Sequence, residues 1–173
     1  MTTLETPNLY LRRFTLDDAQ AYLPLVSMPE VLRYIGEPAQ TSVEGARQIL
    51  LNYPMRHYEV HGFGRMACVE KSSGRLVGFS GLKFVEHLQE VDIGYRFLPE
   101  CWGKGYATES ARALLQDGVR THRLERIVGL VMPENLASAR VLSKLGLSFE
   151  RTIREDDTDV HLYACQVGVN APD

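Results

Sequence analysis

The residues of greatest chemical interest are two glycines, Gly103 and Gly105, at the point where an expected strand gives way to an expected helix. Without Cβ atoms the backbone can bend tightly there and turn several amide N–H groups toward one anion. The start of the helix adds roughly half a positive charge from its dipole. The turn over residues 102–107 is therefore a candidate cradle for a phosphate or pyrophosphate group. A glycine-rich turn between a strand and a helix is also an ordinary structural turn, and that alternative stays open.

Two common phosphate-binding motifs can be compared with this turn. A Walker A loop requires Ser or Thr directly after Gly-Lys, whereas Lys104 is followed by Gly105. The Rossmann fingerprint shares its first two glycines with this turn, but Thr108 stands at its third position. Because the turn also follows hairpin-linked strands, a doubly wound dinucleotide-binding domain is not expected.

The elements that must position this turn follow from local patterns. Alternation of apolar residues predicts strands over about 9–14, 65–70, 76–84, 91–98 and 127–131, and two more around the acidic turn 155–157. Helical spacing predicts helices over about 17–26, 41–53, 107–119 and 135–145. A helix between the strands at 91–98 and 127–131 makes that pair parallel. We expect one α+β domain over residues 1–173, with a mixed, mostly antiparallel sheet of about six to seven strands and about four helices.

Several residues mark the ends of these elements. Thr41 and Glu44 form the expected capping box of the second helix, and Pro54 is expected to kink or end it. Asn135 is the expected N-cap of the last helix, and Gly146 its expected C-cap. A hairpin-like turn is expected at 72–74.

Composition and charge exclude several classes of function. The 173 residues carry 19 Lys and Arg against 22 Asp and Glu, a net charge of −3, which opposes direct binding of nucleic acid. The apolar runs are far shorter than a membrane span, and the first residues lack a secretory signal, so a cytoplasmic protein is expected. Three widely spaced cysteines fit neither a disulfide framework nor a zinc site. His57 and His61 have no third ligand in a recognised pattern, so no metal is expected.

From Val91 onward the sequence resembles the GNAT superfamily of N-acetyltransferases, which bind acetyl-coenzyme A at an Arg/Gln-x-x-Gly-x-Gly/Ala turn. Gly105 and Ala107 occupy the last two marked positions, and Trp102 replaces the usual Arg or Gln. Four segments are similar to the ribosomal-protein N-acetyltransferase (Rim-type) group, namely 29–36, 93–95, 102–109 and the pair Asn135 and Ser138. The resemblance implies a GNAT fold and direct transfer of an acetyl group from acetyl-coenzyme A to a primary amine.

The resemblance also implies which residues hold the coenzyme. Backbone groups of Phe97 and Leu98, at the end of a strand, would hold the pantetheine arm and the thioester carbonyl. Asn135 would contact the same arm, serve as an ordinary helix cap, or do both. The pyrophosphate would lie against the turn formed by Trp102, Gly103, Lys104, Gly105, Tyr106 and Ala107.

Two residues are candidates for the proton transfers. Ser138 resembles a serine near the coenzyme sulfur, from which a proton would pass to the departing thiolate. Many relatives use a Tyr one turn further on, but that position is Leu142 here, which excludes a tyrosine acid at that site. Asp92, with Glu90 two residues earlier, is the leading candidate for a general base. The alternative for Asp92 is a solvated strand residue.

The acceptor is expected to meet the helical segment before the strands, where Met28 and Tyr34 are candidate substrate residues or else core residues. At pH 7 an α-amine is roughly a tenth neutral, and a Lys amine well under a thousandth, so a site without a strong base favours α-amines. The expected acceptor is the N-terminal α-amine of a ribosomal protein or other peptide. The alternatives are a small amine such as a polyamine or aminoglycoside, or an acyl-CoA-binding module without transfer activity. A monomer or homodimer without membrane contact is expected.

Overall fold

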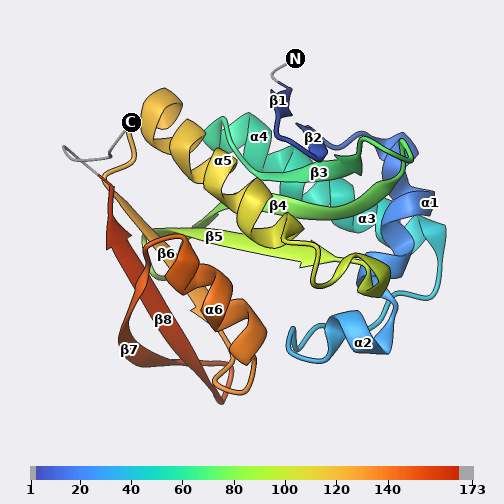
Figure 1. Ribbon diagram of the computed structural model, residues 1–173. Coiled ribbons are helices and arrows are strands. Elements are labelled where there is room, and N and C mark those ends of the chain that lie inside the picture. Colours follow the sequence, from blue (N-terminus) through green and yellow to red (C-terminus); the bar gives the residue numbers. More distant parts are fainter. Residues whose placement is uncertain (1–2, 168–173) are drawn as a thin grey trace.

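The computed structural model describes residues 3–167 and is built around one mixed sheet (Figure 1). Within these residues the sheet has eight strands, in the order β1-β2-β3-β4-β5-β6-β8-β7. Neighbouring strands are antiparallel except β5 and β6, which are parallel. The strands are β1 (Leu4–Glu5), β2 (Leu9–Arg12), β3 (Arg65–Glu70), β4 (Leu76–Val85), β5 (Glu90–Phe97), β6 (Arg126–Val131), β7 (Ser148–Glu155) and β8 (Thr158–Gln166).

The α+β class is confirmed, and the strand count is higher than predicted. The additional strand is β1, which pairs with β2 through Leu4 opposite Leu11. Two residues are too few to show an alternating pattern. The helices α1 (Ala19–Tyr22), α3 (Val43–Leu50), α5 (Tyr106–His122) and α6 (Leu136–Lys144) lie where helices were predicted. Two further short helices are α2 (Pro29–Leu32) and α4 (Arg56–His61).

The N-terminal helices differ in detail from their predicted limits. The N-cap of α3 is Ser42 and not Thr41, because the Ser42 hydroxyl accepts the N–H of Gly45 at 3.0 Å. Pro54 does not end the helical run: it lies in a π-helical stretch, Leu51–Met55, that joins α3 to α4. The wider π turn accommodates a residue that has no amide hydrogen to donate.

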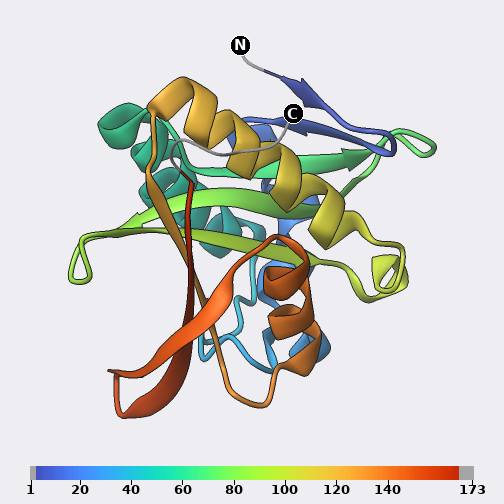
Figure 2. The same cartoon turned by 60° about the vertical axis from the view of Figure 1, so that its left-hand side comes forward.

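The sheet is covered on both faces. Helix α5 lies across one face, and α1, α3 and α4 lie on the other, as the two views show together (Figure 1, Figure 2). The face under α5 holds a core that includes Leu9, Ile93 and Leu114. The opposite face holds a second core that includes Phe14 and Phe79. Burial of both apolar faces is the main force that fixes the sheet between the helices.

Strands β5 and β6 separate along the sheet. Their parallel register joins Asp92 to Val128, and beyond that pair the two strands diverge while α6 packs beside the opening (Figure 1, Figure 2). The predicted crossover is confirmed, since α5 connects these two parallel strands. Beyond Asp92, the edge of β5 that faces β6 is therefore open to an extended ligand.

Strand β2 is joined to the start of α1 through an ion pair between Arg12 and Asp18. Both guanidinium Nη atoms of Arg12 donate to the Asp18 carboxylate, at 2.8 and 2.7 Å. The N–H of Thr15 adds a third hydrogen bond at 2.9 Å. Burial raises the pKa of Asp18, but the hydrogen bonds from Arg12 and Thr15 outweigh it, so the pKa lies below its ordinary value of 3.8.

The Asp18→Asn variant is expected to lose about 1.5–3 kcal/mol of unfolding free energy at pH 7, the range for hydrogen bonds to a charged group. A carboxyl with a lowered pKa in the folded state stabilises the protein above its unfolded pKa and loses that effect as the pH falls. The difference between wild type and variant should therefore shrink from pH 7 toward pH 3. Urea unfolding at several pH values measures it, and a difference that stays constant would contradict the assignment.

Candidate functional site

The turn over residues 102–107 has the backbone geometry of an anion site. Gly103 and Gly105 have φ angles of +77° and +82°, and nothing lies within 4 Å of a Cβ built at either position. Glycine is thus required there by backbone conformation and not by space. The first bond of α5 runs from the Glu109 N–H to the Gly105 carbonyl at 3.0 Å. The three preceding amides, those of residues 106–108, have no acceptor within the helix and fit an anion.

Trp102 anchors this turn to the end of β5. Its indole Nε1 donates to the Phe97 carbonyl at 2.8 Å, although the side chain is 54% exposed. The Leu98 N–H donates to the Val77 carbonyl, and the Leu98 carbonyl accepts the N–H of Cys101, both at 2.9 Å. The structure therefore places Phe97 and Leu98 beside the turn, but with these backbone groups already bonded inside the chain.

Lys104 and Tyr106 converge on one carboxylate. Glu70 accepts the Tyr106 hydroxyl at 2.7 Å and the Lys104 ammonium at 3.4 Å. Hydrogen bonds from Ser73 and then Tyr106 lower the pKa of Glu70 to about 2, and the bond to Glu70 raises the pKa of Tyr106 to about 12. The Tyr106 hydroxyl is therefore bonded to Glu70 at the end of β3, and the group of Tyr106 that can bind a ligand is its backbone N–H.

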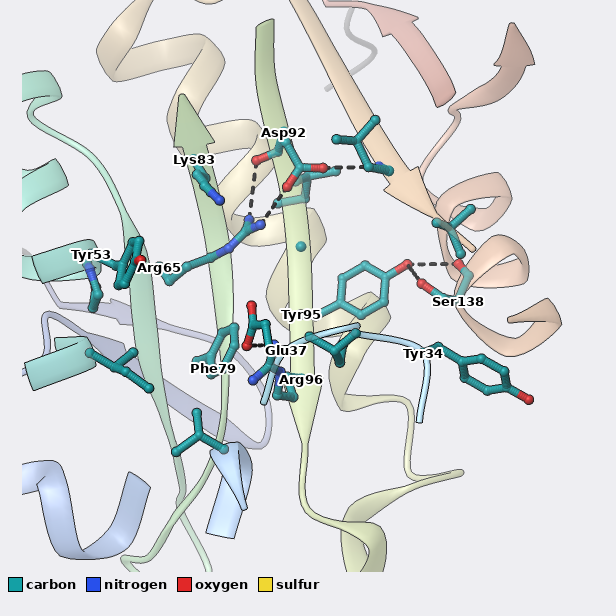
Figure 3. Close-up of a pocket in the computed structure, with 18 of the residues that line it drawn as sticks. Tyr34, Glu37, Tyr53, Arg65, Phe79, Lys83, Asp92, Tyr95, Arg96 and Ser138 are labelled. Carbon is teal, nitrogen blue, oxygen red and sulfur yellow. Dashed lines mark hydrogen bonds and ion pairs between the residues drawn. The ribbon is translucent and has the colours of Figure 1, made fainter. Parts of the chain in front are cut away.

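A pair of hydroxyl groups joins β5 to α6 beside the opening between β5 and β6. The Tyr95 hydroxyl donates to the Ser138 carbonyl at 2.8 Å, and the Ser138 hydroxyl donates to the Tyr95 oxygen at 3.1 Å (Figure 3). Asn135 fixes the start of the helix, since its side-chain oxygen accepts the Ser138 N–H at 3.2 Å. Burial raises the pKa of Tyr95, so its hydroxyl stays protonated.

Tyr95 is a site residue that sequence reasoning missed. Leu142, one turn after Ser138, is 1% exposed and packs over Gly129, where no side chain would fit. A tyrosine hydroxyl does reach Ser138, but from Tyr95 on β5 and not from α6. The segment 93–95 was singled out as a similarity to relatives, but nothing in its spacing shows that Tyr95 reaches Ser138.

Asp92 is buried and ion-paired. It is 7% exposed, its Oδ2 lies 2.5 Å from Arg65 Nη2, and its Oδ1 accepts the Leu130 N–H at 3.1 Å. Glu90 is paired with Arg126 at 2.9 Å. The alternative of a solvated strand residue at Asp92 is therefore wrong: its carboxylate joins β5 to β6 at the point where they diverge.

A cavity of about 550 Å³ extends from Asp92 to the Tyr95–Ser138 pair. Its lining includes Tyr34, Asp92, Tyr95, Asn135 and Ser138, and Figure 3 shows residues from the N-terminal helices, β4, β5 and α6 around it. Met28 packs instead against the second core. The cavity therefore brings together four predicted site residues, Tyr34, Asp92, Asn135 and Ser138, and adds Tyr95, the hydrogen-bond partner of Ser138.

Other candidate groups lie outside this arrangement. Within residues 3–167, no cluster of three His, Cys, Asp or Glu side chains is placed to hold a metal. In the same range, no helix is long and apolar enough to cross a membrane. Cys68, Cys101 and Cys165 are free thiols, and burial raises the pKa of each.

This chain is similar in sequence to members of one known protein family. Residues 8–148 match the family described as an acetyltransferase (GNAT) domain. The uncharacterized N-acetyltransferase YoaA of Bacillus subtilis is 31% identical over 153 residues, which cover 88% of this chain and 86% of YoaA.

Two solved structures show the same fold. A GNAT-family acetyltransferase from Bacillus anthracis has a TM-score of 0.80 at 26% identity and covers 95% of this chain and 98% of its own. RimL, a ribosomal L7/L12 α-N-protein acetyltransferase in complex with coenzyme A, has a TM-score of 0.80 at 19% identity. The match covers 96% of this chain and 98% of the RimL chain. The chain belongs to the GNAT family and is an N-acetyltransferase.

Proposed function

We propose that this N-acetyltransferase moves an acetyl group from acetyl-coenzyme A directly to a primary amine, with the N-terminal α-amine of a peptide as acceptor. The observation that carries the proposal is the Tyr95–Ser138 hydroxyl pair, which lines the cavity at the open edge of β5. From this pair, β5 leads directly to the turn whose amides are free for an anion. A proton donor and a phosphate site are thus joined by one strand.

The residues of the turn fit the phosphates of the coenzyme. The amides of Tyr106 and Ala107 point along the start of a 17-residue helix, where a pyrophosphate is favoured by both hydrogen bonds and the dipole. Acetyl-coenzyme A supplies an acetyl group activated as a thioester. Asn135, at the start of α6, lines the same cavity and is placed to contact an extended arm.

The Tyr95–Ser138 hydroxyl pair is placed to supply the proton that the departing thiolate needs. Ser138 would turn its hydroxyl hydrogen from Tyr95 to the departing sulfur and regain a proton from the attacking nitrogen, which loses one as the amide forms. The Tyr95 hydroxyl stays protonated and bonded to the Ser138 carbonyl. A positioned proton donor of this kind contributes about 10²–10⁴-fold to a rate. Direct attack needs no covalent enzyme intermediate, which leaves the buried Cys101 outside the reaction.

The choice of an α-amine rests on the amine that must attack. An α-amine is roughly a tenth neutral at pH 7 and attacks without a strong base. Asp92 remains a candidate base, but each of its oxygens already accepts a hydrogen bond from Arg65 or Leu130. RimL, which shares this fold, acts on a protein α-amine by its description. The alternative acceptors are small amines, and the alternative function is coenzyme binding without transfer.

Release of free thiol from acetyl-coenzyme A tests the proposal. The chain is incubated with short peptides, their N-terminally blocked forms, polyamines and aminoglycosides. Thiol release with free peptides and none with blocked ones is the expected result. Faster release with polyamines or aminoglycosides would reject the peptide acceptor, and tight coenzyme A binding with no release for any amine would favour the binding module.

The Gly105→Ala variant is expected to raise the dissociation constant of coenzyme A about ten-fold. A left-handed backbone costs a residue with a Cβ about 1–2 kcal/mol, so the chain relaxes and turns the amides of the turn away. Gly146→Ala is the matched control, because Gly146 has φ +90° and equally open surroundings but caps the end of α6. Calorimetric titration measures both, and equal weakening in the two variants would contradict the assignment of the turn.

A further inference from the structure

The cavity of the proposed active site holds more positive than negative charge. Arg65, Lys83 and Arg96 line it, together with two carboxylates, Asp92 and Glu37. Both carboxylates are already paired: Asp92 with Arg65 at 2.5 Å and Glu37 with Arg96 at 3.2 Å. Among residues 3–167, Lys83 has no ion-pair or hydrogen-bond partner.

Lys83 stands on β4 directly opposite Asp92 in the strand register. Its side chain points into the cavity beside the Arg65 guanidinium (Figure 3). Burial and then Arg65 lower the pKa of Lys83, which shows that its surroundings disfavour the ammonium. A further nearby carboxylate, Glu155, is bonded to His87 at 2.8 Å. No carboxylate near Lys83 is free to neutralise it.

Arg96, a second cation of the cavity lining, also has a donor without an acceptor. Arg96 Nε is buried without a hydrogen-bond partner among the described residues. The two Nη atoms of Arg96 donate to the Leu25 carbonyl at 3.1 Å and to Glu37 at 3.2 Å. Buried donors are nearly always satisfied, so the residues around this cavity carry more donors than their own acceptors satisfy, although Nε itself is enclosed by protein atoms.

We propose that the acceptor carries a carboxylate that Lys83 binds, several bonds away from the amine that is acetylated. This inference rests on the proposed function and names its substrate class. Tyr95 follows Asp92 by three residues on β5, which is about 10 Å at 3.3 Å per residue, so the anion and the reacting amine are well separated. A polyamine or an aminoglycoside would place further positive charge beside Lys83, with no free carboxylate to receive it.

Matched acceptor pairs test this inference with the complete chain. One pair is a C-terminally amidated Ser-Glu-Ala-Ala peptide and its amidated Ser-Gln counterpart, and the other is 4-aminobutyrate and 4-aminobutyramide. Spermidine is the polycation. Because one hydrogen bond to a charged group contributes about 1.5–3 kcal/mol, the anionic member should have a kcat/KM about 10- to 100-fold higher. The pair that shows this preference identifies the source of the carboxylate as a peptide or a small amine.

Two variants separate the role of Lys83 from general charge effects. Lys83→Gln should abolish the preference, because the kcat/KM of the anionic member falls about 10- to 100-fold toward that of the neutral member. Lys71→Gln is the matched control, because Lys71 lies outside the cavity and forms an ion pair with Glu5 at 2.7 Å. This variant should keep the preference for the anionic member. An equal or faster rate for the neutral members, or a preference that survives in Lys83→Gln, overturns this inference alone. A faster rate with spermidine overturns this inference and the peptide acceptor together. Absence of thiol release with every acceptor overturns the proposed function and this inference with it.

Discussion

The Ser138→Ala variant is expected to lose about 100-fold in kcat, the lower end of the range for a positioned proton donor, with an unchanged dissociation constant for coenzyme A. The variant removes one hydroxyl and keeps the backbone N–H that Asn135 caps. Ser143→Ala is the matched control on the same helix, since the exposed Ser143 hydroxyl donates to the Ala139 carbonyl at 3.1 Å. Steady-state thiol release and calorimetry measure the two parameters.

The Tyr95→Phe variant extends this prediction to the second hydroxyl. If the two hydroxyl groups act as one unit, Tyr95→Phe alone loses a similar factor, and the double variant is no slower than the slower single variant. Fully additive losses would show two independent roles. Because burial raises the pKa of Tyr95, wild-type activity should show no tyrosine ionisation below pH 10. A Ser138→Ala variant with wild-type kcat would exclude the hydroxyl pair as the proton donor.

The parts of the fold that were predictable are those specified by neighbouring residues. The apolar spacing of α5, the Asn135 cap of α6 and the turns at 72–74 and 155–157 all depend on a few consecutive positions. Strand β1 depends instead on distant residues. The Thr6 hydroxyl, directly after β1, and the Asn8 N–H both donate to the Glu109 carboxylate, at 2.6 and 2.8 Å. Glu109 lies about 100 residues further along the chain. No local pattern in the sequence reports such a contact.

The same distinction holds for the candidate site. Gly103 and Gly105 could be found from sequence, because a strand, a tight turn and a helix follow one another there. Tyr95 and Lys83 could not, since their roles arise from pairing between separate elements: Tyr95 with α6, and Lys83 across the register from Asp92. The buried state of Asp92 also depends on Arg65, which reaches it from β3 across β4.

The Arg65→Met variant is expected to lose about 3–5 kcal/mol of unfolding free energy, the cost of leaving a buried carboxylate without its partner. The side chains of Arg65 and Asp92 are only 18% and 9% exposed. Arg154→Met is the contrasting control, because its pair with Asp159 is 61% and 59% exposed, and such pairs contribute about 0–1 kcal/mol. Urea unfolding at neutral pH measures both variants, and equal losses would contradict the buried character of the Arg65 pair.

The double variant Arg65→Met with Asp92→Asn shows whether the lost unfolding free energy comes from the unpaired Asp92 charge or from the other hydrogen bonds of Arg65. The asparagine removes the unpaired charge but keeps an oxygen for the Leu130 N–H, so the double variant should be more stable than Arg65→Met alone. If it is not, the loss comes from the other bonds of Arg65, such as the one to the Gly81 carbonyl. In Arg65→Met alone the released Asp92 carboxylate faces Lys83 across the strand register and should weaken the preference for anionic acceptors, whereas the double variant has no carboxylate at position 92 and should restore that preference.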